Sequence, residues 1–214
     1  MSLPKPYYQD DYCTIYNADC RKILPFLEPV DLVLTDPPYG INENDKKVAS
    51  RGKLANCKDY GVFNWDKKLV EQWVIDSLIA NSRYQVIWGG NYYKLPPCKG
   101  PLVWDKLNTG DFADGEMAWN NYGSALRIIQ HLWNGMIRKN QEDRFHPTQK
   151  PVDVIKWAIS LCPIQAQTIL DPFMGSGTTL RAAKDLNRKA IGIEIEEKYC
   201  EIAVERLRQE VLAL

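Results

Sequence analysis

"ILDPFMGSGTT", residues 169–179, joins an apolar strand to a helix through a glycine turn. The strand is expected to end at Asp171, the turn contains Gly175 and Gly177, and a helix is expected to begin at about Thr178. Glycine lets the backbone approach a ligand closely, and the first turn of a helix offers free N–H groups. In an open parallel sheet, ligands bind outside the carboxyl ends of the strands against such turns. The stretch therefore predicts a strand–turn–helix unit at a binding site.

The same alternation of strands and helices runs along the rest of the chain. Short apolar runs predict strands at 13–19, 30–36, 84–90, 100–106, 168–173 and 189–195. Helical spacing of apolar residues predicts helices at 67–81, 151–161, 177–187 and 196–212. Several of the strands are apolar throughout, which favours a parallel sheet buried on both faces. The sequence thus predicts an α/β fold, with a doubly wound, mostly parallel sheet and helices on both faces.

The chain of 214 residues has no linker or internal repeat, so we expect a single domain over 1–214. Two segments, 41–66 and 107–145, lack sustained periodicity, and both contain clusters of basic residues. A long irregular segment in a compact domain is usually functional or disordered, and a solvated surface loop is the plain alternative. We expect 41–66 to be a flexible loop that faces the substrate.

Composition excludes several classes of protein. Basic and acidic residues balance at 27 each, which argues against a surface that binds nucleic acid throughout but leaves room for a local patch. The sequence has no apolar run of roughly 18 residues, so no membrane contact is expected, and no signal peptide is apparent. The six cysteines form no C-x-x-C pair, so we expect no metal site and reduced thiols in a cytoplasm.

The glycine turn also limits the choice of ligand. It lacks the lysine of a triphosphate-binding loop, and it does not meet the spacing of the dinucleotide fingerprint, which leaves a nicotinamide cofactor as a second choice. Glu194 follows Gly175 by 19 residues, at the end of the next predicted strand. An acid in that place accepts both hydroxyls of a ribose. S-adenosylmethionine fits such a site, although Glu194 could also be a solvated residue at the start of the last helix.

Four blocks together carry a family resemblance. "TDPPYG" (35–40), "FHPTQKP" (145–151), "DPFMGSGTT" (171–179) and "IGIEIEEKYCEIA" (191–203) resemble the DNA amino-methyltransferases. The first block precedes the glycine turn, which resembles the permuted beta group of adenine-N6 and cytosine-N4 enzymes. The match runs along most of the chain. It implies the S-adenosylmethionine-dependent methyltransferase fold in permuted order, with S-adenosylmethionine as the cofactor and duplex DNA with a flipped base as the substrate.

The chemistry of an exocyclic amino group explains the D-P-P-Y residues. The lone pair of that nitrogen is delocalised into the ring, so the site must favour a tetrahedral nitrogen. The Asp36 carboxylate can accept one N–H, and the carbonyl of Pro37, held by Pro38, can accept the other. Acceptors fixed in this way stabilise the transition state. Tyr39 offers a stacking face to a base that has left the duplex. A simple turn after the strand is the alternative.

The resemblance also implies a set of cofactor-binding residues. Asp19 would contact the adenine, Thr148 and Lys150 would bind the methionine carboxylate, and Phe173 would lie against the cofactor. Asp36 would border the cofactor as well as the base. The remaining expected cofactor residues are those of the glycine turn and the ribose acid: Asp171, Gly175, Ser176, Gly177, Thr178 and Glu194. Trp88 and Trp104 are expected in the core.

The sequence departs from the family pattern in its target-recognition region. Only residues 107–145 are available for it, so we expect a small recognition insert and a short or relaxed recognition sequence, as in prophage-type orphan enzymes. Each bidentate base contact discriminates by only about 1–3 kcal/mol. Asp36 stands where cytosine-N4 members mostly have Ser, which favours adenine-N6.

Other functions remain open at this point. The same chemistry could act on cytosine N4 or on RNA, and a non-catalytic module that binds S-adenosylmethionine and DNA is a further alternative. Protein-glutamine methyltransferases differ in having Asn-Pro-Pro-Tyr after the glycine motif. The resemblance is compatible with a homodimer. It is also compatible with a bacterial or phage-infected cell as the place where the protein acts. A cognate restriction nuclease cannot be inferred from this chain.

Overall fold

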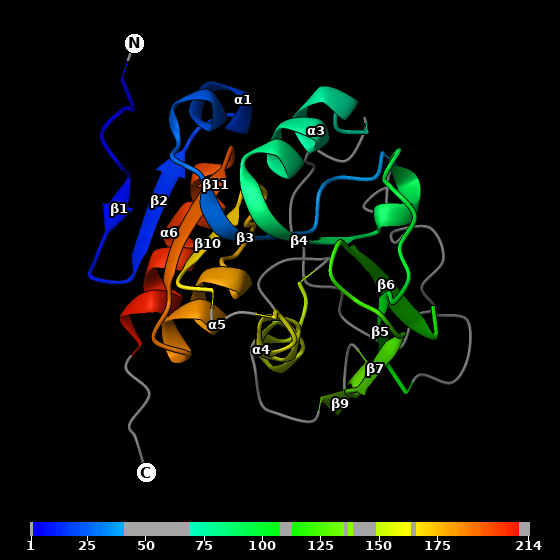
Figure 1. The fold of residues 1–214 in the computed structure, drawn as a ribbon. Coiled ribbons are helices and arrows are strands. Elements are labelled where there is room, and N and C mark those ends of the chain that lie inside the picture. The colour runs from blue at the N-terminus through cyan, green and yellow to red at the C-terminus, as the bar shows by residue number, and fades with distance from the viewer. Residues whose placement is uncertain are drawn as a thin grey trace.

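The structure, a computed structural model, describes residues 2–40, 69–107, 113–134, 137–138, 149–163 and 166–209. A nine-stranded sheet has the order β1-β2-β11-β10-β3-β4-β6-β5-β7, and β8 and β9 form a separate pair (Figure 1). The strands are β1 Tyr8–Gln9, β2 Cys13–Asn17, β3 Val30–Thr35, β4 Ser82–Trp88, β5 Leu102–Asp105, β6 Gly115–Asn120, β7 Arg127–Gln130, β8 Trp133–Asn134, β9 Ile137–Arg138, β10 Thr168–Asp171 and β11 Lys189–Glu194. The helices are α1 Cys20–Ile23, α3 Gln72–Ala80, α4 Val152–Ser160, α5 Thr178–Asp185 and α6 Glu197–Arg208, with 3-10 turns at Leu24–Phe26 and Gly90–Tyr92.

Five neighbouring strands, β2, β11, β10, β3 and β4, are parallel. β10 pairs with β3 on one side and with β11 on the other, so three strands far apart in the sequence are adjacent in space. Because parallel strands end at the same edge, the residues that follow β3, β10 and β11 gather at one edge of the sheet. The predicted doubly wound, mostly parallel sheet is confirmed.

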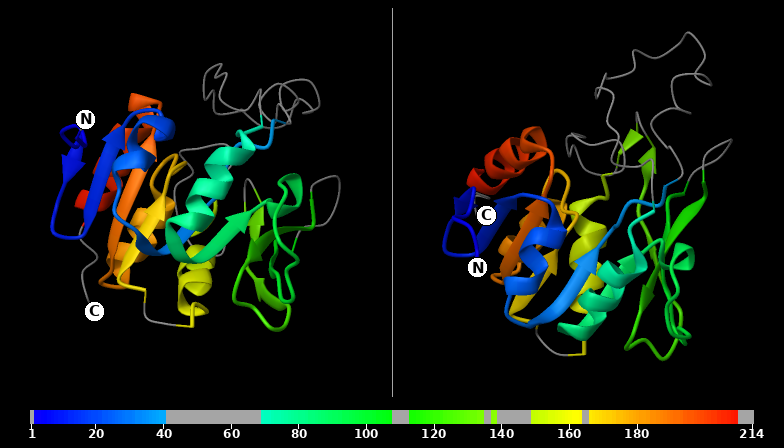
Figure 2. Two further views of the ribbon diagram at one scale, coloured as in Figure 1. Left: turned by 45° about the horizontal axis from the view of Figure 1, so that its top comes forward. Right: turned by 90° about the horizontal axis from the view of Figure 1, so that it is seen from above.

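Helices cover both faces of this sheet (Figure 2). Helices α4, α5 and α6 pack on one face, and α1 and α3 pack on the other. Along β3 the side chains alternate between the two layers: Leu32 and Leu34 belong to the core under α4–α6, whereas Val33 belongs to the core under α3. This burial on both sides explains why the strand is apolar throughout.

The predicted helices are present, but the first one is shorter than expected. Residues 67–81 were predicted to be helical, whereas α3 begins at Gln72. Leu69 instead forms an antiparallel bridge with Tyr39, in the turn after β3. The chain therefore stays extended before α3 because its backbone pairs with the D-P-P-Y turn. None of the helices in the described part of the chain is long and apolar enough to cross a membrane.

The expectation that 107–145 is irregular is wrong for its middle part, which contains β6 and β7. β6 lies between β4 and β5 and is antiparallel to both. Near its end, Ala118 is buried on one face of the sheet and Trp119 on the other. Because both faces are buried there, the strand is not marked by an alternation of apolar and polar residues. The recognition role of 107–145 stays a prediction. The segment 41–66 lies outside the described residues.

Candidate active site

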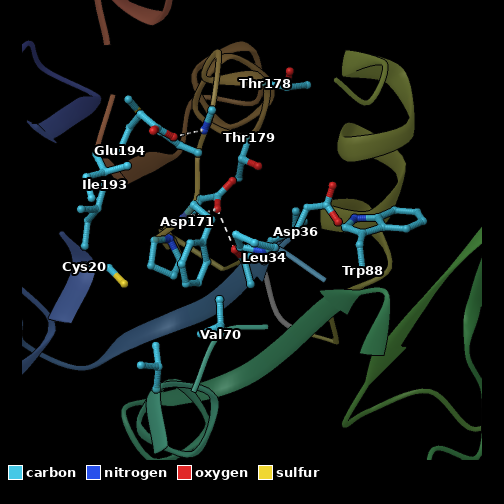
Figure 3. A pocket seen from close by; sticks show the side chains of 18 of the residues that line it. Cys20, Leu34, Asp36, Val70, Trp88, Asp171, Thr178, Thr179, Ile193 and Glu194 are labelled. Atoms are coloured by element: carbon cyan, nitrogen blue, oxygen red, sulfur yellow. Dashed lines mark hydrogen bonds between the residues drawn. The ribbon is translucent and has the colours of Figure 1, made fainter. Parts of the chain in front are cut away.

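A cavity of about 380 Å³ opens at the carboxyl ends of β2, β11, β10 and β3. This volume is within the range of small-molecule sites. Asp36 after β3 and Gly175 in the glycine turn both line it. Figure 3 shows Asp171 between Glu194 on one side and Asp36 on the other. The two strand ends that the sequence analysis singled out therefore share one pocket.

Asp171 joins the ends of β10 and β3. Its Oδ1 accepts a hydrogen bond from the Thr35 hydroxyl at 2.8 Å and another from the Phe173 N–H at 3.1 Å. Burial raises the pKa of Asp171 to about 6, while bonds from Thr179, Thr35 and Phe173 oppose the rise. Asp171 therefore ties the end of β3 to the end of β10 at the wall of the cavity.

The glycine turn is held in place by the last helix. Gly175 and Gly177 have positive φ angles of 51° and 77°, and a Cβ on Gly177 would lie 2.7 Å from the Cβ of Ala203 in α6. Only glycine fits such a close approach with that backbone. The buried Arg206, also in α6, donates to the Ser176 carbonyl at 2.7 Å. Arg206 is not predicted by the sequence, because helical periodicity marks it only as one of several charged residues.

Glu194 is fixed at the rim of the cavity rather than solvated at the start of α6. Its Oε2 accepts the N–H of Gly175 at 3.0 Å, and its Oε1 accepts the N–H of Glu196 at 2.9 Å. Burial raises the pKa of Glu194 to about 7, against the effect of these bonds. Each carboxylate oxygen keeps a second lone pair, which can accept a hydroxyl from a ligand.

The remaining walls suit a nucleoside with a cationic tail. Asp19 lines the cavity after β2, caps α1 and pairs with Arg21, which lowers the pKa of its carboxyl. Phe173, Ile193 and Ile195 add apolar surface. Carboxylates with an apolar wall between them match hydroxyl donors, a flat base and a positive charge. The acceptors and the apolar wall of this cavity therefore fit S-adenosylmethionine.

Asp36 is held by two side chains. Its Oδ1 accepts the hydroxyl of Tyr39, and its Oδ2 contacts the ammonium of Lys150. Burial raises the pKa of Asp36, and Lys150 opposes part of that rise. The Tyr93 hydroxyl donates to the carbonyl of Pro38 at 2.7 Å, which fixes the rest of the turn. The Asp36 carboxylate is therefore oriented before any substrate arrives.

Tyr39 lies beside the cavity, in an aromatic stack. Its ring stacks on Tyr92 with centroids 4.8 Å apart and planes at 19°. Gly89 lies next to the ring with a φ angle of 61°, and a Cβ there would lie 2.2 Å from the nearest atom of the Tyr39 ring. A side chain at position 89 would displace the ring, so this glycine sets the position of Tyr39.

The structure gathers most of the predicted site residues around the cavity. Lys150 lines it, but its ammonium contacts Asp36 and Glu116. Thr148 lies outside the described residues. Among the described residues, those predicted for the site that do not line the cavity are Pro37, Tyr39 and Gly177. The cavity residues predicted from sequence are Asp19, Asp36, Pro38, Lys150, Asp171, Phe173, Gly175, Ser176, Thr178 and Glu194.

Two further residues near Asp36 were not predicted for the site. Glu116, on β6, pairs with Lys150, and it stands in a segment that the sequence marked only as irregular. Trp88 was expected in the core and is fully buried, yet it also lines the cavity. Its ring lies 5.1 Å from the ammonium of Lys150. Neither residue stands in a short motif, so local pattern could not have identified them.

Comparisons with known proteins show what the sequence and the fold are similar to. The family model for DNA methylases of the N6/N4 type matches residues 112–205. The type II methyltransferase M2.LlaDCHI of Lactococcus lactis subsp. cremoris is 28% identical, over 97% of this chain and 93% of that protein. The type II methyltransferase M2.DpnII of Streptococcus pneumoniae is 27% identical, over 97% of this chain and 94% of that protein.

Solved structures share the fold. The complex of M1.HpyAVI with SAM aligns with a TM-score of 0.60 at 23% identity, over 92% of this chain and 100% of that one. The cytosine-N4-specific PvuII DNA methyltransferase aligns with a TM-score of 0.62 at 14% identity, over 98% of this chain and 91% of that one. Sequence relatives along nearly the whole chain, the matching family model and the shared fold lead to one conclusion. The chain is similar along nearly its whole length to type II methyltransferases, and its residues 112–205 match the family of DNA methylases of the N6/N4 type.

Proposed function

We propose that this protein transfers a methyl group from S-adenosylmethionine to the exocyclic N6 amino group of an adenine flipped out of DNA. The observation that carries the proposal is the shared cavity: Asp36 lies at one end, Glu194 at the other, and Asp171 between them. One end has the acceptors for an amino group, and the other has an acceptor for ribose hydroxyls.

Residues around the cavity have distinct roles in this proposal. Bound S-adenosylmethionine supplies a methyl group that is activated by its sulfonium. Glu194 accepts the ribose hydroxyls, Asp19 lies toward the adenine of the cofactor, and Phe173 packs against it. The turn of Gly175 and Ser176, fixed by Arg206, lets the backbone approach the cofactor closely. No side chain would have to remove a proton before transfer, because the nitrogen lone pair forms the new bond to carbon as the bond from sulfur to the methyl group breaks. The methylated nitrogen is then cationic and loses its proton to solvent.

The Asp36 end binds the amino group. Asp36 already accepts the Tyr39 hydroxyl and the Lys150 ammonium, one on each oxygen, and a carboxylate has about four acceptor positions. It can therefore accept an N–H of the substrate without losing either partner. An oriented acceptor costs little reorganisation when charge develops on the nitrogen. Tyr39, backed by Tyr92, offers a rigid face for the flipped base.

Adenine is preferred over cytosine because of the residue at position 36. The resemblance associates Asp before Pro-Pro-Tyr mainly with adenine-N6 enzymes, and Ser mainly with cytosine-N4 enzymes. A short or relaxed recognition sequence, a homodimer and a cytoplasmic location stay predictions.

The proposal is tested with labelled methyl transfer. Purified protein is incubated with methyl-labelled S-adenosylmethionine and unmethylated DNA, and the nucleosides are then separated by mass spectrometry. We expect N6-methyladenine as the product. Asp36→Ala should lower the rate at least about a hundredfold, because it removes an acceptor aimed at the developing charge. Binding of S-adenosylmethionine, measured by calorimetry, should persist in this variant.

Each alternative gives a different product. N4-methylcytosine would move the assignment to the cytosine-N4 branch of the same family. Incorporation of the label into RNA but not into DNA would change the proposed substrate from DNA to RNA. Equal incorporation of labelled methyl groups by the wild type and Asp36→Ala would mean that Asp36 takes no part in catalysis. Cofactor binding without transfer to any of these substrates would favour a non-catalytic module.

A further inference from the structure

Glu116, on β6, lies between two lysine ammonium groups. Its Oε1 is 2.6 Å from Lys106 Nζ, and its Oε2 is 3.0 Å from Lys150 Nζ. The same Lys150 ammonium contacts Asp36 Oδ2. The four side chains therefore form a continuous chain of alternating charge, which begins at the end of β5 and ends at the carboxylate of the D-P-P-Y turn.

The two ammonium groups of this chain of charges are largely shielded from water, whereas the side chains of Glu116 and Asp36 are 32% and 24% exposed. The side chain of Lys150 is 5% exposed, and that of Lys106 is 16% exposed. Each ammonium lies over an indole ring: Lys150 Nζ is 5.1 Å from the ring of Trp88, and Lys106 Nζ is 5.0 Å from that of Trp104. A ring face favours the charged form of an ammonium. A buried charge that loses its partner is strongly unfavourable, so each member of the chain holds its neighbours in place.

Resting on the proposed function, we propose that Glu116 is a positioning residue for methyl transfer. It holds the Lys150 ammonium beside Asp36 and takes part of its charge, so that the Asp36 carboxylate is oriented but remains a strong acceptor for the substrate amino group. Glu116 does not line the cavity, and it therefore acts through Lys150.

The electrostatics agree with this geometry. Burial acts to raise the pKa of Glu116, but Lys150 and Lys106 outweigh it and lower the pKa to about 2, so Glu116 is ionised near neutral pH. The groups in the described part that face Asp36 are Lys150, Glu116, Tyr39 and Asp171. After burial, Lys150 lowers the pKa of Asp36 and Glu116 raises it. Glu116 thus moderates the effect of Lys150 on the carboxylate that accepts the substrate.

The first test is Glu116→Gln, which keeps the shape of the side chain and removes its charge. We expect kcat for N6-methyladenine formation to fall roughly ten- to a hundredfold, because Lys150 stays paired with Asp36 but is no longer oriented by a second carboxylate. The change in KM for S-adenosylmethionine should be much smaller. The acid limb of the pH–kcat profile should move to lower pH, since Asp36 loses a nearby negative charge and ionises more readily. A purely structural role would not shift that limb.

The second test is Lys106→Met, which removes the other partner of Glu116. The uncompensated charge of Glu116 should then make Asp36 harder to ionise, so the acid limb should move to higher pH. This variant tests the proposal even where Glu116→Gln fails to fold. In the double variant Glu116→Gln/Lys106→Met, one negative and one positive charge are removed, and their effects on the pKa of Asp36 oppose each other. The acid limb of the pH–kcat profile should therefore return toward that of the wild type. Its kcat should stay low, because Lys150 still lacks the second carboxylate that orients it.

Asp185→Asn is the matched control. Asp185 ends α5, does not line the cavity, and lies between Lys156 Nζ at 2.5 Å and Arg181 Nη2 at 2.7 Å. The Asp185→Asn variant measures the effect of removing a carboxylate that lies between two cations elsewhere in the fold. Glu116 variants with the kcat and pH profile of this control would overturn the inference. Absence of N6-methyladenine with the wild-type protein would instead overturn the proposed function, which is a separate readout.

Discussion

Lys150 contacts the carboxylate of Asp36, although the two residues are 114 positions apart in the chain. Lys150 lies in the block expected to bind the methionine carboxylate, and Asp36 lies in the block expected to bind the amino group. Their contact joins the two halves of the site, so that a change at the cofactor end can alter the acceptor at the base end.

Lys150→Met should therefore change the pH dependence of methyl transfer. Without the ammonium, burial and the charge of Glu116 raise the pKa of Asp36 further, so the acid limb of the pH–kcat profile should move to higher pH. The rate should also fall, because the carboxylate loses one of its two anchors. Steady-state kinetics across the pH range measure both effects. An unchanged limb would mean that Lys150 does not control Asp36, and the cofactor affinity of the same variant tests the role expected from sequence.

Tyr39 makes two separable contributions, a hydrogen bond to Asp36 and a stacking face backed by Tyr92. Tyr39→Phe should lower kcat with little change in KM for DNA, because it keeps the ring. Tyr39→Ala should also weaken DNA binding by about 1–3 kcal/mol, the contribution of stacking on one base. Binding to a duplex with an abasic site at the target position is the control, since stacking is then absent in both variants. Equal DNA affinity of the Phe and Ala variants would contradict the stacking role.

Cofactor affinity should depend on pH through Glu194. Its pKa is raised to about 7, and hydroxyl donors bind the ionised carboxylate better than the protonated one. Binding therefore favours loss of the proton, and affinity should rise as pH rises through about 7. From pH 6 to pH 7.5 the Kd for S-adenosylmethionine should fall roughly tenfold. Calorimetry at both pH values measures this, and Glu194→Gln should bind more weakly, with a much flatter dependence. A wild-type Kd that is constant over this range would remove Glu194 from ribose binding.

Arg206→Met should loosen the glycine turn. It removes the donor to the Ser176 carbonyl at 2.7 Å and to the Thr178 hydroxyl at 3.2 Å, both in a buried place. The free energy of unfolding should fall by about 2–4 kcal/mol, because buried acceptors lose a charged partner. Cofactor affinity should fall as well. Arg208→Met, at an exposed position on the same helix, is the control and should change neither quantity much. Urea titration and calorimetry distinguish the two variants, and similar values for both would contradict the role of Arg206.

Local pattern was sufficient for the framework of the site. The apolar runs at 30–36, 168–173 and 189–195 predicted strands, and the glycines at 175 and 177 predicted a turn into a helix. These features depend on neighbours within a few residues, through strand burial and the backbone angles that only glycine adopts easily. The polar residues that end those strands could therefore be chosen from the sequence as candidates for one binding edge.

The sequence alone thus determined the alternating fold, the strand ends that carry Asp36, Asp171 and Glu194, and the family resemblance. Tertiary structure alone decided that β6 lies between β4 and β5, and this placement brings Glu116 against Lys150 and connects Lys106 to Asp36. The physical reason is range: propensity and periodicity act over a few residues. An ion pair instead forms wherever the packing of distant segments leaves opposite charges in contact away from water.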